Sequence, residues 1–159
     1  MSLCTLSVRR RRYIAALPNA TTRAMQVSSA FHQVLYISQL APGLKYDTFT
    51  ALCRTARGRN AELGTSGVLL FDGQRFCQLL QGEAQTVRTL MREIAGDPRH
   101  EGLALLVDGP AAPAEIDRHW WAGYCDAHEL DVLDAALGVR GEAALATFRD
   151  IVSRADLSP

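Results

Sequence analysis

The chain has 159 residues, of which 48% are hydrophobic and 21% are charged. This fits one soluble domain with a buried core, because single domains typically contain about 100–150 residues. Seventeen basic and seventeen acidic side chains give a formal net charge of zero, so no broad electrostatic surface for nucleic acid or membrane is expected. No run of about 18 apolar residues occurs, so no membrane span is predicted.

The first 30 residues differ from the rest because they are basic and contain no acidic residue. Four arginines occupy positions 9–12, and the segment also contains serines. This composition is typical of a transit peptide. Two alternatives remain open: a disordered tail, which we expect for 1–30, or a start at Met25.

The four cysteines are scattered, at Cys4, Cys53, Cys77 and Cys125. No CxxC pair and no histidine at ligand spacing accompanies them. Neither a metal site nor a disulfide framework is predicted, and a reducing, cytoplasmic setting fits best.

The first predicted strand covers 33–38 within the stretch FHQVLYISQLAP and places Tyr36 on the same face as Val34 and Ser38. Apolar residues then recur at helical spacing from Lys45 to about Leu63, which predicts a helix that packs one face on a sheet.

Two strands are predicted at 66–83 around Asp72-Gly73, because Asp-Gly between apolar runs is a strong hairpin signal. The remaining expected elements are a helix at 83–95, strands at 102–109 and 119–125, and helices at about 128–137 and 141–153 separated by Gly138. The order predicts an α+β ferredoxin-like sandwich, βαββαβ plus an extra strand, with both helices on one face and a short helical C-terminal extension.

Gln78 is the first candidate for a functional residue, because it lies between Phe76 and Leu80 on one face of its strand. An unpaired amide there would cost about 1–3 kcal/mol, so a partner is expected. A purely structural bond to Tyr36 or to the backbone is the simplest interpretation.

Other polar and aromatic residues have ordinary explanations when each is taken alone. Asn60 fits a turn asparagine at a helix end, and of the neighbours Trp120 and Trp121 one is expected to face the core while the other lines a groove or interface. Asp97, Arg99 and His100 fit solvated residues at a helix end.

The joint arrangement of these residues resembles the BLUF domain, the flavin-binding module of blue-light photoreceptors. The resembling stretches are VLYISQL, RNAELGTSGVLLFDGQRFCQLLQGE, DPRH and WWAGY, in the family's order. The resemblance covers about Gln33 to Cys125.

The resemblance implies that the cofactor is FAD, with its ring between the two helices. Tyr36 matches the photoactive tyrosine, Gln78 the switching glutamine and Trp120 the tryptophan of the last strand. Asn60 matches the asparagine that holds the polar edge of the ring. The segment with Asp97, Arg99 and His100 matches the border of the ribityl and phosphate part.

The resemblance further implies a light-induced electron and proton transfer from Tyr36 that leaves Gln78 rotated or tautomerised and signals to a protein effector. Three positions depart from the family. Ala122 stands where a methionine is usual, Thr65 replaces an apolar β-branched residue, and a basic residue of the second helix appears shifted, with Arg92 followed by Glu93.

The expected organisation is a basic extension at 1–30, a BLUF-like domain at 31–126 and a helical cap at 127–159 that covers the far face of the sheet or builds a homo-oligomer. We expect no enzyme, because no nucleophile with an adjacent base can be placed. One alternative is a dark interaction module without flavin photochemistry, suggested by Ala122 and Thr65. Another is RNA binding, which only the arginines at 9–12 favour.

Overall fold

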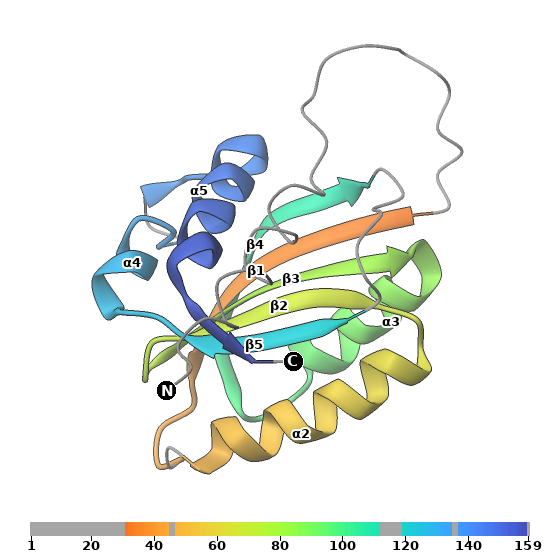
Figure 1. Ribbon diagram of the computed structural model, residues 1–159, viewed down its shortest axis with the longest axis horizontal. Helices are drawn as coiled ribbons and strands as arrows, with labels where there is room; N and C mark the ends of the chain where they lie inside the picture. Colours follow the sequence, from red (N-terminus) through yellow and green to blue (C-terminus); the bar gives the residue numbers. More distant parts are fainter. Residues whose placement is uncertain (1–30, 45–46, 112–118, 135–136, 159) are drawn as a thin grey trace, which may run out of the picture.

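The computed structural model describes residues 31–44, 47–111, 119–134 and 137–158, without the side chains of Asp47 and Thr48. Within these residues, six strands form one sheet in the order β4, β1, β3, β2, β5, β6 (Figure 1). The strands are β1 (Phe31–Leu40), β2 (Ser66–Phe71), β3 (Arg75–Glu83), β4 (His100–Pro110), β5 (Trp120–Tyr124) and β6 (Asp156–Ser158).

Helices cover both faces of the sheet. Helices α2 (Asp47–Glu62) and α3 (Ala84–Ala95) lie on one face, and α4 (Ala127–Asp131) and α5 (Gly141–Arg154) lie on the other (Figure 1). We call these the α2/α3 face and the α4/α5 face.

The strand directions give two βαβ units. Strands β1 and β2 both pair antiparallel with β3, and β3 and β4 both pair antiparallel with β1. Helix α2 therefore connects two parallel strands, as does α3, and β5 adds parallel to β2. The predicted ferredoxin-like α+β sandwich is confirmed.

The predicted turn between β2 and β3 is also confirmed. Gly73 has a φ of 99°, which glycine adopts without steric cost. The Asp72 carboxylate accepts hydrogen bonds from the backbone N–H groups of Gln74, at 2.9 Å, and Arg75, at 2.6 Å.

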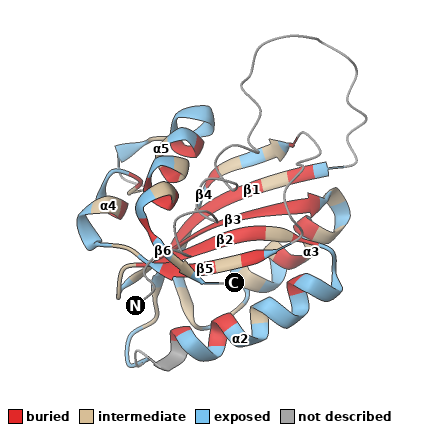
Figure 2. Cartoon of the chain, in the orientation of Figure 1, coloured by how far each residue is buried: buried red, intermediate tan, exposed pale blue. Residues whose placement is uncertain are grey.

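The largest apolar cluster lies on the α4/α5 face. Alternate residues of the central strands, including Leu35, Val68 and Leu79, pack there against Leu145 and Phe148 of α5. Figure 2 shows the buried residues concentrated in the central strands and the inner sides of the helices. Helices α4 and α5 thus cover the face of the sheet opposite to α2 and α3.

The structure corrects the sequence-based expectation in two places. The helix predicted at 128–137 is wrong in length, because α4 ends at Asp131 and a turn follows at Val132 and Leu133. Strand β6 was not predicted. The extension at 1–30 lies outside the described residues, and the division at residue 126 stays a prediction.

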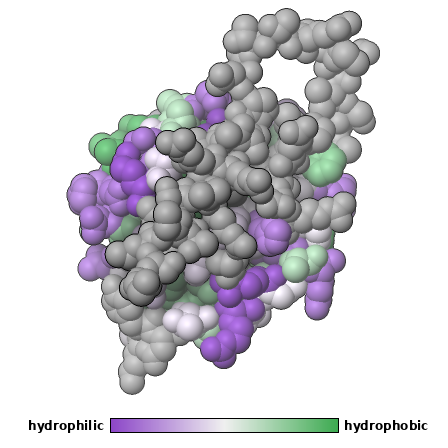
Figure 3. All heavy atoms as spheres, in the orientation of Figure 1, coloured by the Kyte–Doolittle hydropathy of each residue, from purple (hydrophilic) through white to green (hydrophobic). Residues whose placement is uncertain are grey.

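The outer surface of α2 is polar, and Figure 3 shows hydrophilic residues over this part of the molecule. No helix among the described residues is long and apolar enough to cross a membrane.

Candidate functional site

Tyr36 and Gln78 form a hydrogen-bonded pair at the centre of the sheet. They are register partners on β1 and β3, so their side chains point to the same face. The Tyr36 hydroxyl donates to Gln78 Oε1 at 2.6 Å. Both side chains are buried, with 1% and 4% of their surface exposed. The expectation that Gln78 has a partner is confirmed, and the partner is the phenol.

Burial sets the protonation state of this phenol. Removal from water raises the pKa of Tyr36 far above its ordinary value, and the nearby Cys77 and Asp97 raise it further. The hydroxyl therefore keeps its proton at physiological pH.

The pair separates two apolar clusters on the α2/α3 face. Phe76, on one side of Gln78 along β3, packs with Phe49 and Leu52 of α2. Leu80, on the other side, packs with Val87 and Leu90 of α3. The polar pair thus lies between the apolar faces of the two helices.

His100 and Ser38 form a wall beside Tyr36. Ser38 Oγ lies 2.8 Å from His100 Nδ1, and the His100 ring stands edge-on to Tyr36 with centroids 6.2 Å apart. Burial lowers the pKa of His100, which Asp97 opposes and Arg99 reinforces, so the imidazole is neutral at pH 7.

This contact corrects the expectation that no nucleophile lies beside a base, because Ser38 and His100 are 62 residues apart in sequence. Ser38 is only 2% exposed. Its hydroxyl is therefore buried against the histidine ring.

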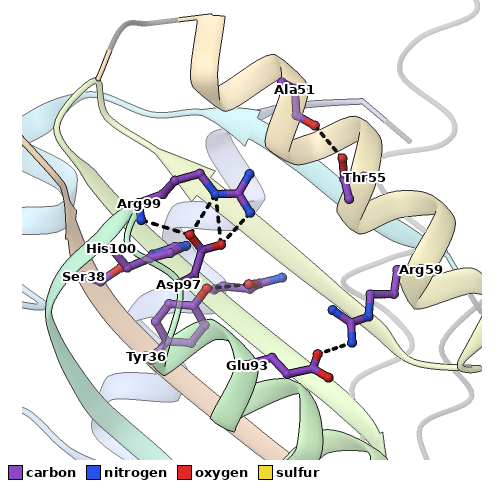
Figure 4. Close-up of polar contacts among 10 residues, drawn as sticks. Tyr36, Ser38, Ala51, Thr55, Arg59, Glu93, Asp97, Arg99 and His100 are labelled. Atoms are coloured by element: carbon purple, nitrogen blue, oxygen red, sulfur yellow. Dashed lines mark hydrogen bonds and ion pairs between the residues drawn. The ribbon is translucent and has the colours of Figure 1, made fainter. Parts of the chain in front are cut away.

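Asp97 and Arg99 lie in the turn that leads into β4, next to Tyr36 (Figure 4). Arg99 Nε donates to both oxygens of the Asp97 carboxylate at 2.9 Å. These charge-assisted bonds lower the pKa of Asp97 despite its partial burial. The backbone of this turn also bonds the end of β1, from Ala41 N to Arg99 O at 3.0 Å.

Asn60 lies in the last turn of α2 and is 4% exposed. The Thr65 hydroxyl lies 3.1 Å from Asn60 Oδ1, to which it donates. The expected position at the C-terminal end of the helix is confirmed, but Asn60 itself is helical and the positive φ of 64° belongs to Gly64. Thr65 is 1% exposed, and its hydroxyl holds the Asn60 side chain through this bond.

The neighbouring tryptophans of β5 point to opposite faces, as predicted. Trp120 is buried in the cluster with Phe49 and Ala122, and half-buried Trp121 packs on the α4/α5 face. Neither indole Nε1 has a hydrogen-bond acceptor among the described residues. Ala122 is buried, and its side chain is a single methyl group.

Arg59 of α2 and Glu93 of α3 form an ion pair that connects the two helices (Figure 4). Both side chains are nearly half exposed, so the pair contributes little to stability. The BLUF resemblance predicted a basic residue on this surface of α3, where Glu93 lies instead. The positive charge at this place comes from Arg59 of α2.

The match to a family model decides the assignment: the model "BLUF: Sensors of blue-light using FAD" matches residues 31–120, more than half of the chain. The chain belongs to the BLUF family. BLUF domains are flavin-binding sensors of blue light, so the expected family and fold are confirmed.

Two curated BLUF relatives illustrate the similarity. The chain is 37% identical over 59 residues to photoactivated adenylate cyclase subunit beta of Euglena gracilis, which covers 37% of this chain and 7% of that protein. It is 35% identical over 104 residues to the blue light- and temperature-regulated antirepressor BluF of Escherichia coli strain K12, which covers 65% of this chain and 23% of the relative. The chain therefore matches only a small part of these longer proteins.

Solved BLUF structures share the fold. The dark-state structure of BlrB has a TM-score of 0.60 at 23% identity, over 79% of this chain and 97% of that one. The photo-activated state of BlsA has a TM-score of 0.67 at 19% identity, over 81% of this chain and 99% of that one.

The donor groups on the α2/α3 face fit the polar edge of a flavin. The side-chain nitrogens of Gln78 and Asn60 make no hydrogen bond to any described residue, while their oxygens are engaged by Tyr36 and Thr65. Two amide N–H donors are thus available beside apolar walls. A ring whose edge carries nitrogen and oxygen acceptors suits this set.

Two supporting residues escaped the sequence analysis. Thr65 was considered only as a departure from the family, and Ser38 only as a neighbour of Tyr36 along the strand. The signal for Ser38 was its position on the face of Tyr36, but its partner His100 depends on pairing between β1 and β4.

Proposed function

We propose that this chain is a blue-light photoreceptor that binds FAD between α2 and α3, with Asn60 and Gln78 at the polar edge of the ring. Asp97, Arg99 and His100 border the ribityl and phosphate part. The single observation that carries the proposal is the buried bond of 2.6 Å from the Tyr36 hydroxyl to Gln78 Oε1. When bound, FAD supplies the light-absorbing ring and the acceptor of one electron and one proton.

Tyr36 is the donor in this proposal. Its phenol ring gives up an electron, its hydroxyl gives up a proton through the bond to Gln78, and both return, so no net chemistry occurs. Gln78 is left rotated or tautomerised, because an amide can both donate and accept. A rearranged Gln78 presents a different hydrogen bond to the ring edge.

The signal then passes across the sheet. Gln78 of β3 is the register partner of Leu69 in β2, and Leu69 is the register partner of Ala122 in β5. A change at Gln78 shifts the population of two arrangements of β5 and Trp120. An unidentified protein effector responds to the switched state, and the chain acts as a sensor and not as an enzyme, in the cytoplasm and as a homo-oligomer.

The decisive experiment is a visible absorption spectrum of the purified protein in the dark and after blue illumination. A hydrogen bond about 1 kcal/mol stronger to the excited ring than to its ground state shifts the band to the red by on the order of 10 nm. A flavin spectrum with such a shift, reversed in the dark, supports the proposal. Chromatography of the released flavin distinguishes FAD from FMN.

A second candidate function rests on Ala122, which stands where the family commonly has a methionine. In this case the domain keeps its fold as an interaction module without photochemistry. A protein that is colourless and does not take up added FAD would support this alternative and contradict the photoreceptor.

A further inference from the structure

A groove of about 430 Å³ runs between α3 and β4, on the side of α3 away from α2. Its apolar wall consists of Val34, Met91, Ala95, Leu103 and Leu105. Leu105 is 43% exposed although it is large and apolar. Figure 2 shows that β4 is more exposed along its length than the neighbouring strand β1.

Strand β4 forms the outer edge of the sheet, since it pairs with β1 on one side and with no other described strand. An edge strand offers N–H and C=O groups to an added chain. A groove between an edge strand and a helix accepts one extended peptide, which gains main-chain hydrogen bonds from the strand and side-chain contacts from the groove.

The charges around the groove indicate which charge a bound peptide should carry. Arg88 and Arg92 of α3 line it, both are exposed, and neither forms an ion pair with a described residue. Asp108, also in the lining, is already paired with His32 through Nε2 and Oδ1 at 2.5 Å. The two unpaired cations favour an acidic segment, and the acid-free segment 1–30 of this chain carries the wrong charge.

The groove adjoins the photoactive pair. Leu105 is the β4 register partner of Tyr36, and Val34 lies two residues before Tyr36 on the same face. A small displacement of β1 at Tyr36 is therefore transmitted directly to the apolar wall.

We propose that this groove is the effector site: it binds an extended, apolar segment of a partner protein, flanked by acidic residues, that adds as a strand to the free edge of β4. The assignment of this partner as the effector rests on the proposed photoreceptor function, but binding of the segment in the dark does not.

The test uses two peptides, EEVTVTVEE and KKVTVTVKK, labelled with a fluorophore that is excited by red light, which flavin does not absorb, and the flavin-loaded full chain. Fluorescence anisotropy in the dark should show binding of the acidic peptide roughly tenfold tighter than of the basic one. Arg88→Glu combined with Arg92→Glu should reverse this preference. The matched control, Arg54→Glu with Arg57→Glu on the exposed surface of α2, should leave it unchanged.

Leu105→Asp tests the apolar wall and should weaken the acidic peptide roughly tenfold. The side chain is partly exposed, so the variant should fold, and its flavin spectrum checks this. Equal affinity for both peptides, or an unchanged affinity of Leu105→Asp, would overturn the proposal. A dimer that Leu105→Asp dissociates, with no binding of either peptide, would make a second copy the occupant and also overturn it.

Illumination tests whether the groove is the effector site. The affinity for the acidic peptide should change at least threefold between dark and lit protein, and an unchanged affinity would overturn this role. Failure of the photochemistry would appear in the absorption spectrum and not in the dark peptide assay, so the two failures are distinguishable.

Discussion

The two faces of the sheet are built from the same strands but differ in design. On the α4/α5 face, Leu35, Cys77 and Leu79 belong to one continuous apolar cluster with α5. On the α2/α3 face, Tyr36 and Gln78 divide the apolar residues into two clusters. The continuous face supplies stability, whereas on the divided face a polar pair, which borders the flavin in the proposed function, interrupts the apolar packing.

The largest expected effect is on the divided face. Tyr36→Phe removes the hydroxyl but keeps the ring, so the protein should remain yellow and lose the light-induced red shift entirely. Absorption spectra before and after blue light measure this. Tyr124→Phe, in the exposed end of β5, is the control and should retain the shift. A full shift in Tyr36→Phe would sink the proposed donor role.

A core substitution on the continuous face should lower the stability of the protein and leave the red shift intact. Phe148 of α5 is 1% exposed, so Phe148→Ala should lower the free energy of unfolding by about 3–5 kcal/mol. The size of the red shift should not change. Urea unfolding followed by circular dichroism measures the first quantity. Loss of the shift in a variant that still folds and binds flavin would show that the faces are not separable.

The contact between β5 and β6 gives a smaller effect. A Cβ on Gly123 would lie 2.2 Å from the carbonyl oxygen of Asp156, so Gly123→Ala should displace β6 and cost about 1–3 kcal/mol. Hydrogen exchange of the Ala122 and Tyr124 amides should accelerate. Gly58→Ala, a helical position with open space around it, should instead stabilise the protein by about 0.5–1 kcal/mol. Unchanged exchange in Gly123→Ala would contradict the close pairing.

The smallest effect concerns pH. Because burial lowers the pKa of His100, the unfolded chain binds more protons than the folded one near the ordinary histidine pKa of about 6.5. Stability should therefore rise with pH through this window and fall as the pH drops below about 6.5. His100→Gln should flatten the dependence of the free energy of unfolding on pH, measured between pH 5 and 7.5, whereas His128→Gln on the surface should not. Equal slopes in both variants would contradict the burial effect.

Periodicity predicted most of the fold because side chains alternate in strands and because the Asp72-Gly73 turn has a strong local signal. It also placed Tyr36 and Gln78 on strand faces, and the BLUF resemblance brought them together. The Thr65–Asn60 and Ser38–His100 bonds depend on how a helix end and a sheet edge are positioned, which local patterns do not contain. Strand β6 has three residues, too few for any periodic signal.

The two edges of the sheet have different consequences for assembly. Strand β5, with the apolar sequence WWAGY, would be an open template for another chain, but β6 covers residues 122–124 of it and is short, with Asp156 exposed. Strand β4 at the opposite edge remains available among the described strands. Because β6 is short, the sheet is extended more readily at β4 than at the opposite edge, so association through strands favours closed pairs over fibres.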